Sequence, residues 1–300
     1  MEFRTLRAYV EVVKQGGFSR AAEVLFSTQS TVSKAVKQLE DELGMVLLDR
    51  VGHRSKLTAA GKIVYRRAAS MLVEREDLIA ELDDLRGLKS GSLRIGFSVG
   101  SSILFAPLFA TFRKRYPGVD VRFAVHGSKR LGEMLLAGEL DLGAMLLPLP
   151  DELEWQYVHV EPLMVLMAKG HPLANCDKVD LTRLEDSPFI LFEEDFALNQ
   201  VILDACERRG ITMDIVARSR QIDFIVELVA LGVGIAFLPR MLLERRHHPS
   251  IRYALLDEPQ TEWRIALAWR RGGYLSHAAR EWLALTREVH ATEPESDIGS

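Results

Sequence analysis

Side chains that can reach the base edges and phosphates of a nucleic acid recur between residues 29 and 37. They are Gln29, Ser30, Ser33, Lys34 and Lys37. All fall on one face of a helix predicted over residues 29–43, while apolar residues on the other face recur with the spacing of a core-facing stripe. Amides, hydroxyls and ammonium groups of this length are suited to a major groove. A lysine on its own also fits a solvated helix face, so the neighbouring elements decide between the two.

A second basic group follows at residues 50–56. The apolar run 46–48 and Leu57 flank a glycine-containing tip, which predicts a β-hairpin. Arg50, Arg54 and Lys56 would then face the sugar-phosphate backbone. A helix, a tight turn, a second helix and a basic wing in this order favour DNA binding over a merely solvated surface.

The polar face belongs to the second of two consecutive predicted helices, and the first of them helps to position it. A further helix precedes both, because residues 6–13 follow helical spacing. Ser19 is predicted to cap a helix over residues 20–26, and Thr28 is predicted to cap the polar-faced helix. Gly44 sits where a left-handed residue ends such a helix. The two helices and their turn form a predicted helix-turn-helix.

A long helix is predicted after Thr58, over residues 59–88. Val64, Met71, Leu78 and Leu85 recur every seven residues, and Ala68 and Leu82 are offset by four. This is the seam of a coiled coil. The helix could pack on its own domain, but its charged outer face favours a second helix as partner. A two-fold dimer would present two recognition helices to a dyad-symmetric operator.

The predicted secondary structure changes after a short hinge at residues 87–92, from helices alone to strands that alternate with helices. Strands are predicted at residues 93–98, 119–125, 141–147, 163–168, 189–192, 215–218, 234–238 and 263–269, and helices at residues 103–116, 129–137, 199–209, 222–230 and 276–290. The alternation implies βαβ units and a parallel sheet. Residues 291–300 are expected to fray.

Charge and composition restrict which partners and which functions the chain can have. Residues 1–67 hold 12 Lys and Arg against 7 Asp and Glu, although the chain of 300 residues carries a net charge of −4. A basic head on an acidic body indicates a polyanionic partner. No apolar run approaches the length of a membrane span, and the charged start does not resemble a signal peptide, so we expect a cytoplasmic protein of two to three domains without a membrane partner.

Catalytic and metal-binding patterns are missing from the sequence. There is no Walker loop, H-E-x-x-H or G-x-S-x-G pattern, so we expect no enzyme. His247 and His248 lack further ligands at useful spacing, so no metal site is predicted. Cys176 and Cys206 are interpreted as two ordinary thiols, with a redox switch as the less favoured alternative.

Residues 21–61 closely resemble the head of LysR-type transcriptional regulators. That head usually reads A-x-x-L-x-x-S-Q-(P/S)-A-V-S-x-x-I-x-x-L-E-x-x-L-G-x-x-L-F-x-R, and then L-T-x-A-G. The matching residues are Ala22, Leu25, Gln29, Val32, Ser33, Leu39, Glu40, Leu43, Gly44, Leu47, Arg50, Leu57, Thr58 and Gly61. Thr28, Thr31 and Leu48 depart from the usual Ser, Ala and Phe. Because Thr31 lies on the recognition helix, it is a position where base preference can differ.

The resemblance implies an α/β protein throughout the chain. It places a winged helix-turn-helix at residues 1–58, a linker helix and hinge at 59–91, and a two-lobed, periplasmic-binding-protein-like effector domain at 92–300. Lobe one would take about 92–162 and 263–300, and lobe two about 163–262. The implied function is a one-component transcriptional regulator. Its partners would be double-stranded DNA, an unknown small-molecule co-inducer in the interlobe cleft, other copies of the chain as a dimer of dimers, and RNA polymerase.

Two sets of site residues follow from the pattern and the resemblance together. The DNA-binding set is Ser19, Thr28, Gln29, Ser30, Thr31, Ser33, Lys34, Lys37, Arg50, His53, Arg54 and Lys56. The effector-binding set is Ser98, Gly100, Ser101, Ser102, Ser128, Phe192, Glu193, Phe196 and Gly234. No catalytic residue and no cofactor is predicted.

The effector set rests on where ligands bind in open α/β sheets, beside helix N-termini at the carboxyl ends of strands. The serines at 98–102 and Ser128 follow two predicted strands, and relatives in the family bind effector carboxylates there. Their hydroxyls could equally be plain N-caps. The acidic run 193–195 could repel a second anionic group, favour an amine, or face solvent, which is the favoured interpretation.

Two rival functions remain open from the sequence. The chain could be a small-molecule-binding protein whose head only contacts other proteins, or an enzyme on a two-lobed fold. The basic wing and the missing export signal disfavour the first rival, and the missing catalytic pattern disfavours the second.

Overall fold

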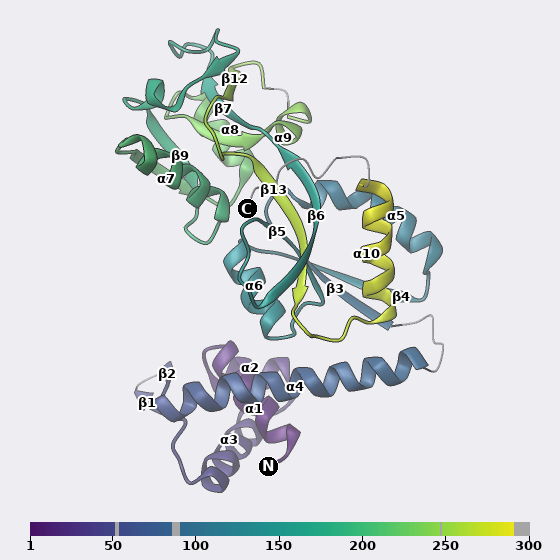
Figure 1. Cartoon of the computed structure of the whole chain (residues 1–300). Helices are drawn as coiled ribbons and strands as arrows, with labels where there is room; N and C mark the ends of the chain where they lie inside the picture. Colours follow the sequence, from purple (N-terminus) through teal and green to yellow (C-terminus); the bar gives the residue numbers. More distant parts are fainter. Residues whose placement is uncertain (52–53, 86–90, 247, 291–300) are drawn as a thin grey trace. The chain divides into compact units, whose positions relative to one another are not determined.

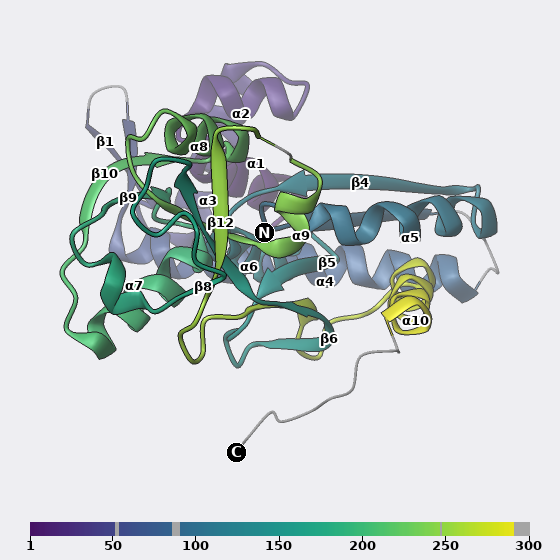
Figure 2. The same ribbon diagram turned by 90° about the horizontal axis from the view of Figure 1, so that it is seen from above.

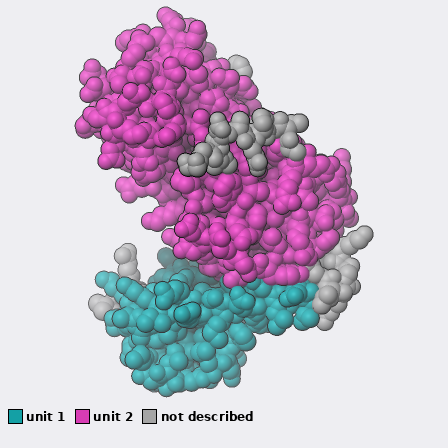
Figure 3. Space-filling model, viewed as in Figure 1, with its two compact units in different colours: residues 1–88 teal, residues 89–300 magenta. Residues whose placement is uncertain are grey.

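The chain divides into two compact units. A computed structural model describes residues 1–51, 54–85, 91–246 and 248–290, and of residues 50–55 and 83–85 it describes no side chains. The first unit spans residues 1–88 and the second spans residues 89–300 (Figure 3). The predicted hinge at 87–92 lies mostly outside the described residues, and the predicted frayed tail at 291–300 lies wholly outside them.

Three helices open the first unit. They are α1 (Phe3–Lys14), α2 (Phe18–Val24) and α3 (Gln29–Leu43). The stripe predicted on α3 is confirmed for Val32, Val36 and Leu39, which are buried in a core that also holds Leu6 and Tyr9 of α1. Its last predicted member, Leu43 at the end of the helix, is 39% exposed. Burying these side chains fixes which face of α3 remains outside.

The ends of the helices test three predictions about capping. Thr28 caps α3, and its Oγ1 accepts a hydrogen bond from the Thr31 amide at 3.2 Å. Gly44 ends α3 with φ 65°, in the left-handed region. The prediction for Ser19 is wrong, because α2 already begins at Phe18, with Gly17 in the cap position. Phe18 packs against the core of the unit, which places the start of the helix there.

The predicted wing is a hairpin of β1 (Leu48–Val51) and β2 (Arg54–Leu57), which pair antiparallel. Helix α3 anchors its first strand, because Glu40 Oε1 accepts hydrogen bonds from the Leu47 amide at 2.7 Å and the Leu48 amide at 3.2 Å. Thr58 Oγ1 donates to the Val46 carbonyl at 2.8 Å on the return. The wing therefore starts from a fixed point beside α3.

The heptad seam of helix α4 (Ala59–Leu85) lies in two different environments along the helix. Near its start, Tyr9 donates a hydrogen bond to the Gly61 carbonyl at 2.8 Å, and Ala68 is buried in the core of the unit. Further along, the side chains of Leu78 and Leu82 are 56% and 46% exposed. The first half of the seam thus packs on its own domain, and the second half lacks cover within the described residues.

The second unit contains a five-stranded sheet in the order β4-β3-β5-β13-β6, which we call lobe one. Its elements are β3 (Gly91–Phe97), α5 (Ser102–Arg115), β4 (Val119–Val125), α6 (Ser128–Leu136), β5 (Leu142–Leu146), β6 (Leu153–Glu161), β13 (Trp263–Arg270) and α10 (His277–His290). Helix α5 runs along β4, where Phe109 meets Phe123 edge to face (Figures 1 and 2). Helix α10 adds Trp282, which is fully buried against the aromatic side chains of α5.

The predicted parallel sheet is confirmed for three of the five strands of this lobe. Strands β4, β3 and β5 are parallel, but β13 pairs antiparallel with both β5 and β6. Strand β6, which the sequence analysis did not predict, leaves the lobe, and β13 returns beside it. Two crossing strands that run in opposite directions therefore force a mixed sheet.

Lobe two holds a four-stranded sheet in the order β11-β7-β12-β8 and a parallel pair, β10-β9. Its elements are β7 (Leu163–Ala168), β8 (Lys178–Val179), the 3-10 helix η1 (Leu181–Leu184), β9 (Pro188–Phe192), α7 (Ala197–Arg209), β10 (Asp214–Ser219), α8 (Ile222–Ala230), β11 (Ala236–Pro239), α9 (Arg240–Glu244) and β12 (Ile251–Leu256). Gly234 allows β11 to approach β9, because a Cβ there would lie 2.6 Å from the Pro188 carbonyl oxygen.

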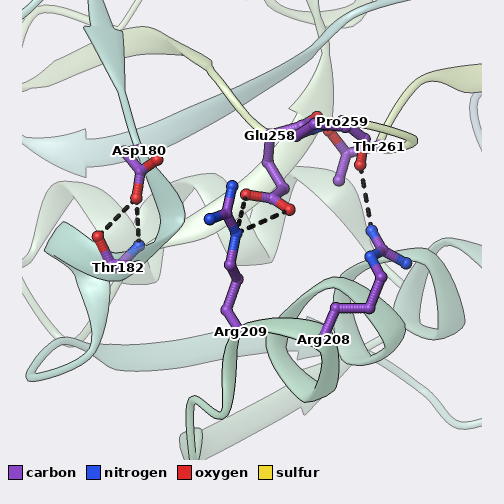
Figure 4. A network of polar contacts seen from close by, with 7 residues as sticks. All are labelled: Asp180, Thr182, Arg208, Arg209, Glu258, Pro259 and Thr261. Carbon is purple, nitrogen blue, oxygen red and sulfur yellow. Dashed lines mark hydrogen bonds and ion pairs between the residues drawn. The ribbon is translucent and has the colours of Figure 1, made fainter.

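The second crossing between the lobes, over residues 256–263, is tied to α7. Arg209 Nε donates to both carboxylate oxygens of Glu258, at 2.9 and 3.2 Å, and Arg208 donates to the Pro259 carbonyl at 3.1 Å (Figure 4). Glu258 is buried, whereas the Arg209 side chain is 41% exposed, so solvent reaches only one side of this ion pair. These contacts hold the crossing against the end of α7.

Candidate functional site

The outward face of α3 carries the polar residues that the sequence predicted. The exposed side chains on it are Gln29, Ser30, Lys34 and Lys37, and Thr31 and Ser33 are half-buried. The same helix buries Val32, Val36 and Leu39 on its other side. The arrangement presents amide, hydroxyl and ammonium groups on one straight element, with the width of a helix that fits a major groove.

Hydroxyl groups hold the start of α3. Thr28 Oγ1 lies 3.0 Å from Ser30 Oγ and 2.8 Å from Thr31 Oγ1. These three side chains therefore satisfy one another and fix the first turn, which gives them a structural role alongside any contact with a ligand. The longer side chains of Gln29 and Lys34 follow directly on that fixed turn.

The other predicted DNA-binding residues belong to α2 and the wing, and only some of their side chains are described. Ser19 is exposed on α2, and Lys56 is exposed on β2. Arg50 and Arg54 lie on β1 and β2, but their side chains, and the whole of His53, lie outside the described residues.

The predicted helix over residues 20–26 ends earlier than expected, because α2 stops at Val24 and Phe26 lies in the turn between α2 and α3. The Phe26 backbone has φ 49°, and its side chain is 99% exposed. Positive φ is uncommon for a bulky residue, so the turn holds local strain. No periodic signal in the sequence marks such a position.

A small cavity lies between the two lobes of the second unit. Its volume of about 20 Å³ holds roughly one water molecule. Four predicted effector residues line it, namely Ser98, Ser128, Phe192 and Phe196. The analysis missed its other walls, which include Val99, Leu146, Leu198, Leu238, Leu242 and Trp263. Their apolar side chains look like ordinary core residues in a sequence.

The polar side chains that line the cavity, those of Ser98 and Ser128, belong to lobe one. Ser98 is 7% exposed, and its Oγ has no hydrogen-bond partner among the described residues. Ser128 Oγ accepts a long hydrogen bond of 3.5 Å from the Leu146 amide, which leaves its proton available. Ser128 is also the first residue of α6, whose cap residue Gly127 supplies no side-chain hydrogen bond.

The remaining predicted effector residues do not line the cavity. Ser101 is fully buried, and its Oγ donates to the Ser98 carbonyl at 2.9 Å. Ser102 is exposed, and Glu193 is half-buried. Gly234 lies at the contact between β11 and β9 described above. Gly100 lies against Leu242, and it is Leu242 that lines the cavity.

Two glycines of lobe one bring the lobes into contact. A Cβ on Gly127 would lie 2.2 Å from the Asp195 backbone oxygen, and one on Gly100 would lie 2.6 Å from Leu242 Cδ1. Gly100 also has φ 87°, which favours glycine. The lobes thus meet at two places where only a glycine leaves room.

Asp195 has a partner inside lobe two. Its carboxylate pairs with Arg220 at 2.9 Å, and the Arg220 guanidinium lies over the Phe196 ring at 5.4 Å. Phe196 in turn stacks on Phe192 at 5.2 Å. The favoured interpretation of this acidic run, solvent exposure, is therefore wrong for Asp195 and holds for the exposed Glu194.

The two cysteines lie in different environments. Burial, with a smaller contribution from Glu258, raises the pKa of the Cys206 thiol to about 11. Cys176 is partly exposed, with Arg183 Nη1 3.7 Å from its sulfur. Among the described residues, no three His, Cys, Asp or Glu side chains come together as a metal site requires, and His247 lies outside them.

None of the helices in the described residues is long and apolar enough to span a bilayer.

Family comparisons match both units. Residues 3–62 match the family described as "Bacterial regulatory helix-turn-helix protein, lysR family", and residues 86–291 match the "LysR substrate binding domain". The chain is 34% identical to the uncharacterized HTH-type transcriptional regulator YwbI of Bacillus subtilis, with 99% of both chains covered. It is 31% identical to the RuBisCO operon transcriptional regulator of Allochromatium vinosum, with 93% of both covered.

Solved structures agree with these matches. A full-length OxyR variant from Pseudomonas aeruginosa is 24% identical and shares the fold with a TM-score of 0.72, covering 99% of both chains. Full-length BenM is 26% identical with a TM-score of 0.60, covering 99% of this chain and 100% of that one. The helix-turn-helix unit, the effector-binding domain and these relatives together show that the chain belongs to the LysR family of transcriptional regulators.

Proposed function

We propose that α3 and the wing bind double-stranded operator DNA, in the cytoplasm where that DNA lies. The observation that carries the proposal is the two-sided helix α3, with Val32, Val36 and Leu39 buried and Gln29, Lys34 and Lys37 exposed. A helix fixed in this way can enter a major groove without unfolding any part of its own core.

Each group on this face has a distinct role. Gln29 and Ser33 are of the length and type that hydrogen-bond base edges. Lys34, Lys37 and Lys56 supply positive charge for phosphates, which sets register and gives affinity that falls with salt. Arg50 and Arg54, placed on the wing strands, belong to the same phosphate-binding group.

The second half of α4 supplies the dimer. Leu78 and Leu82 are exposed on one seam, and burial against the same seam of a second copy removes their apolar surface from water. Two recognition helices related by a two-fold axis then match a dyad-symmetric operator. A dimer of such dimers, contacting RNA polymerase at the promoter, completes the proposed assembly.

A small-molecule effector would act through the cavity between the lobes. The cavity of about 20 Å³ is too small for an organic ligand, so binding must separate the contacts at Gly100 and Gly127. A ligand that favours a separated arrangement shifts the population of lobe positions. Through the second unit it would change how the two heads engage and bend the operator.

The DNA-binding proposal is tested with the variant Lys34→Ala/Lys37→Ala in a mobility-shift titration. Loss of two phosphate contacts is expected to lower operator affinity at least about tenfold at physiological salt, and to flatten the salt dependence by about two charges. Lys169→Ala, an exposed lysine of the second unit, is the matched control. Equal affinities for the three proteins would refute the role of α3.

A further inference from the structure

We propose that Phe26 is a specificity residue of the head, and that its ring contacts the C5-methyl group of a thymine beside the first turn of α3. The inference deepens the proposed DNA binding and rests on it. It is carried by three observations on the turn between α2 and α3. They are the backbone conformation of Phe26, the exposure of its ring, and the exposed surface that joins it to α3.

The end of α2 has a backbone conformation that this chain elsewhere builds with glycine. The Phe26 amide donates to the Glu23 carbonyl at 3.1 Å. The Ser27 amide donates to the Ala22 carbonyl at 2.9 Å, which completes a Schellman motif. Helices α3, α6, α7 and α8 end in the same pair of bonds, each with a glycine at the left-handed position. These glycines are Gly44, Gly138, Gly210 and Gly232. The turn itself therefore does not require phenylalanine, which is strained there.

The Phe26 ring contributes no packing to the fold of the first unit. It is 99% exposed, whereas the preceding Leu25 packs against the core of the head. Burial of the ring therefore does not offset the strained backbone in the free protein. A strained residue with an exposed apolar side chain indicates a surface that becomes covered when the protein binds its partner.

The position of Phe26 points to the partner proposed for α3. Residues 26–30 are all exposed, so the exposed surface runs without a break from Phe26 to the first turn of α3. Thr28 caps α3, and the two Schellman bonds fix the turn to the end of α2. Phe26 therefore keeps a fixed place beside the end of α3 that carries Gln29, and it reaches the DNA when that end lies in a major groove.

The chemistry of the ring selects one group on the DNA. Phenylalanine has no donor or acceptor for the polar edges of the bases and no charge for a phosphate. Among the groups that base pairs present in the major groove, the thymine C5-methyl is the apolar one. Contact between the ring and the methyl group removes apolar surface of both from water. The ring therefore adds a preference for thymine at one position of each half-site.

The test is uracil replacement in a duplex that the full-length wild-type protein selects from a random pool. Each thymine is replaced in turn, at the symmetric positions of both half-sites. Uracil lacks the methyl group and keeps the hydrogen-bonding edge of thymine. We expect one position at which wild-type affinity, measured by mobility-shift titration, falls about fourfold for each methyl group removed.

The variant Phe26→Asn then assigns the methyl contact. Asparagine accepts positive φ and has no apolar ring, so the thermal unfolding midpoint should be unchanged or higher. This variant should bind the selected duplex more weakly than the wild type, and it should not distinguish the thymine duplex from the uracil duplex. Lys34→Ala/Lys37→Ala should bind more weakly overall and keep the full uracil effect. Tyr253→Asn, which removes an exposed aromatic side chain of the second unit, is the matched control and should behave like the wild type.

The outcomes separate this inference from the proposed function. A uracil effect of the same size in Phe26→Asn and the wild type, or no uracil effect at any position, overturns the thymine contact and leaves DNA binding in place. Equal affinity of Phe26→Asn and the wild type for every duplex also overturns it, and would leave the exposed ring for a protein partner. If the wild type selects no duplex, or binds a scrambled one equally well, the proposed function is refuted and the inference falls with it.

Discussion

Among single residues, environment rather than residue type decides the chemistry. Ser98, Ser101 and Ser102 follow one another closely in the sequence, yet the first lines the cavity, the second bonds a backbone carbonyl, and the third is exposed. The sequence could name the serines but not rank them, because strand and helix geometry turn each side chain in a different direction. The same holds for the two cysteines, which are equivalent in the sequence.

Cys206 is expected to be unreactive at neutral pH. Its pKa of about 11 keeps the thiol protonated, and only the thiolate is nucleophilic. Mass spectrometry after iodoacetamide treatment of the native protein should find Cys206 unmodified and Cys176, which is partly exposed, modified. After unfolding, both thiols should react.

The raised pKa of Cys206 also makes the stability of the folded protein depend on pH. Between the ordinary pKa near 9.0 and about 11, the unfolded chain loses the Cys206 proton and the folded protein keeps it. The contribution is therefore present below the unfolded pKa and is lost as pH rises through this window. Rapid native alkylation of Cys206, or a dependence of operator binding on peroxide that Cys206→Ala removes, would contradict this assignment.

For whole elements, periodicity was a sufficient guide where one face is buried. Helix α3 and the first half of α4, which pack on the core of the head, were predicted from apolar spacing. Strands β6 and β12 were missed because their alternation is broken by half-buried residues, and β8 because it has only two residues. The contacts between lobes were also missed, since a glycine that leaves room for a distant backbone looks like any glycine in a turn.

Gly127→Ala should destabilise the second unit. The added Cβ would lie 2.2 Å from the Asp195 backbone oxygen, and backbone yields less easily than a side chain. We expect a loss of about 1–3 kcal/mol, seen as a lower thermal unfolding midpoint. Gly170→Ala is the matched control, because nothing lies within 4 Å of a Cβ there and its φ is not positive.

Equal midpoints for the two glycine variants would show that the lobes do not press on each other at Gly127. A lower midpoint for Gly127→Ala, with operator binding retained, would place the effect in the effector-binding unit alone.

For the whole molecule, the proposed dimer depends on the second half of α4. Its leucines, Leu78 and Leu82, are exposed. Among the described residues of the predicted seam, they present the largest apolar surface that the first unit does not cover. Association through it would join two heads that each hold one recognition helix, and the pair would bind an operator more tightly than either alone.

Leu78→Glu/Leu82→Glu should therefore break the dimer. Carboxylates in an apolar seam lose hydration and repel their copies across the two-fold axis. Sedimentation should give the mass of one chain for this variant, and at least twice that mass for the wild type. Arg66→Glu, an exposed residue on the far side of α4, changes charge without entering the seam and serves as control. A variant that sediments like the wild type would place the interface elsewhere.

Local spacing and contiguous motifs were enough to predict the helices of the head, the polar face of α3, the wing and the division into a basic head and an α/β body. The folded chain was needed to show which serines face the cavity, that Asp195 pairs with Arg220, and that β13 makes the sheet mixed. These features join residues distant in the chain, and local propensity carries no information about such encounters.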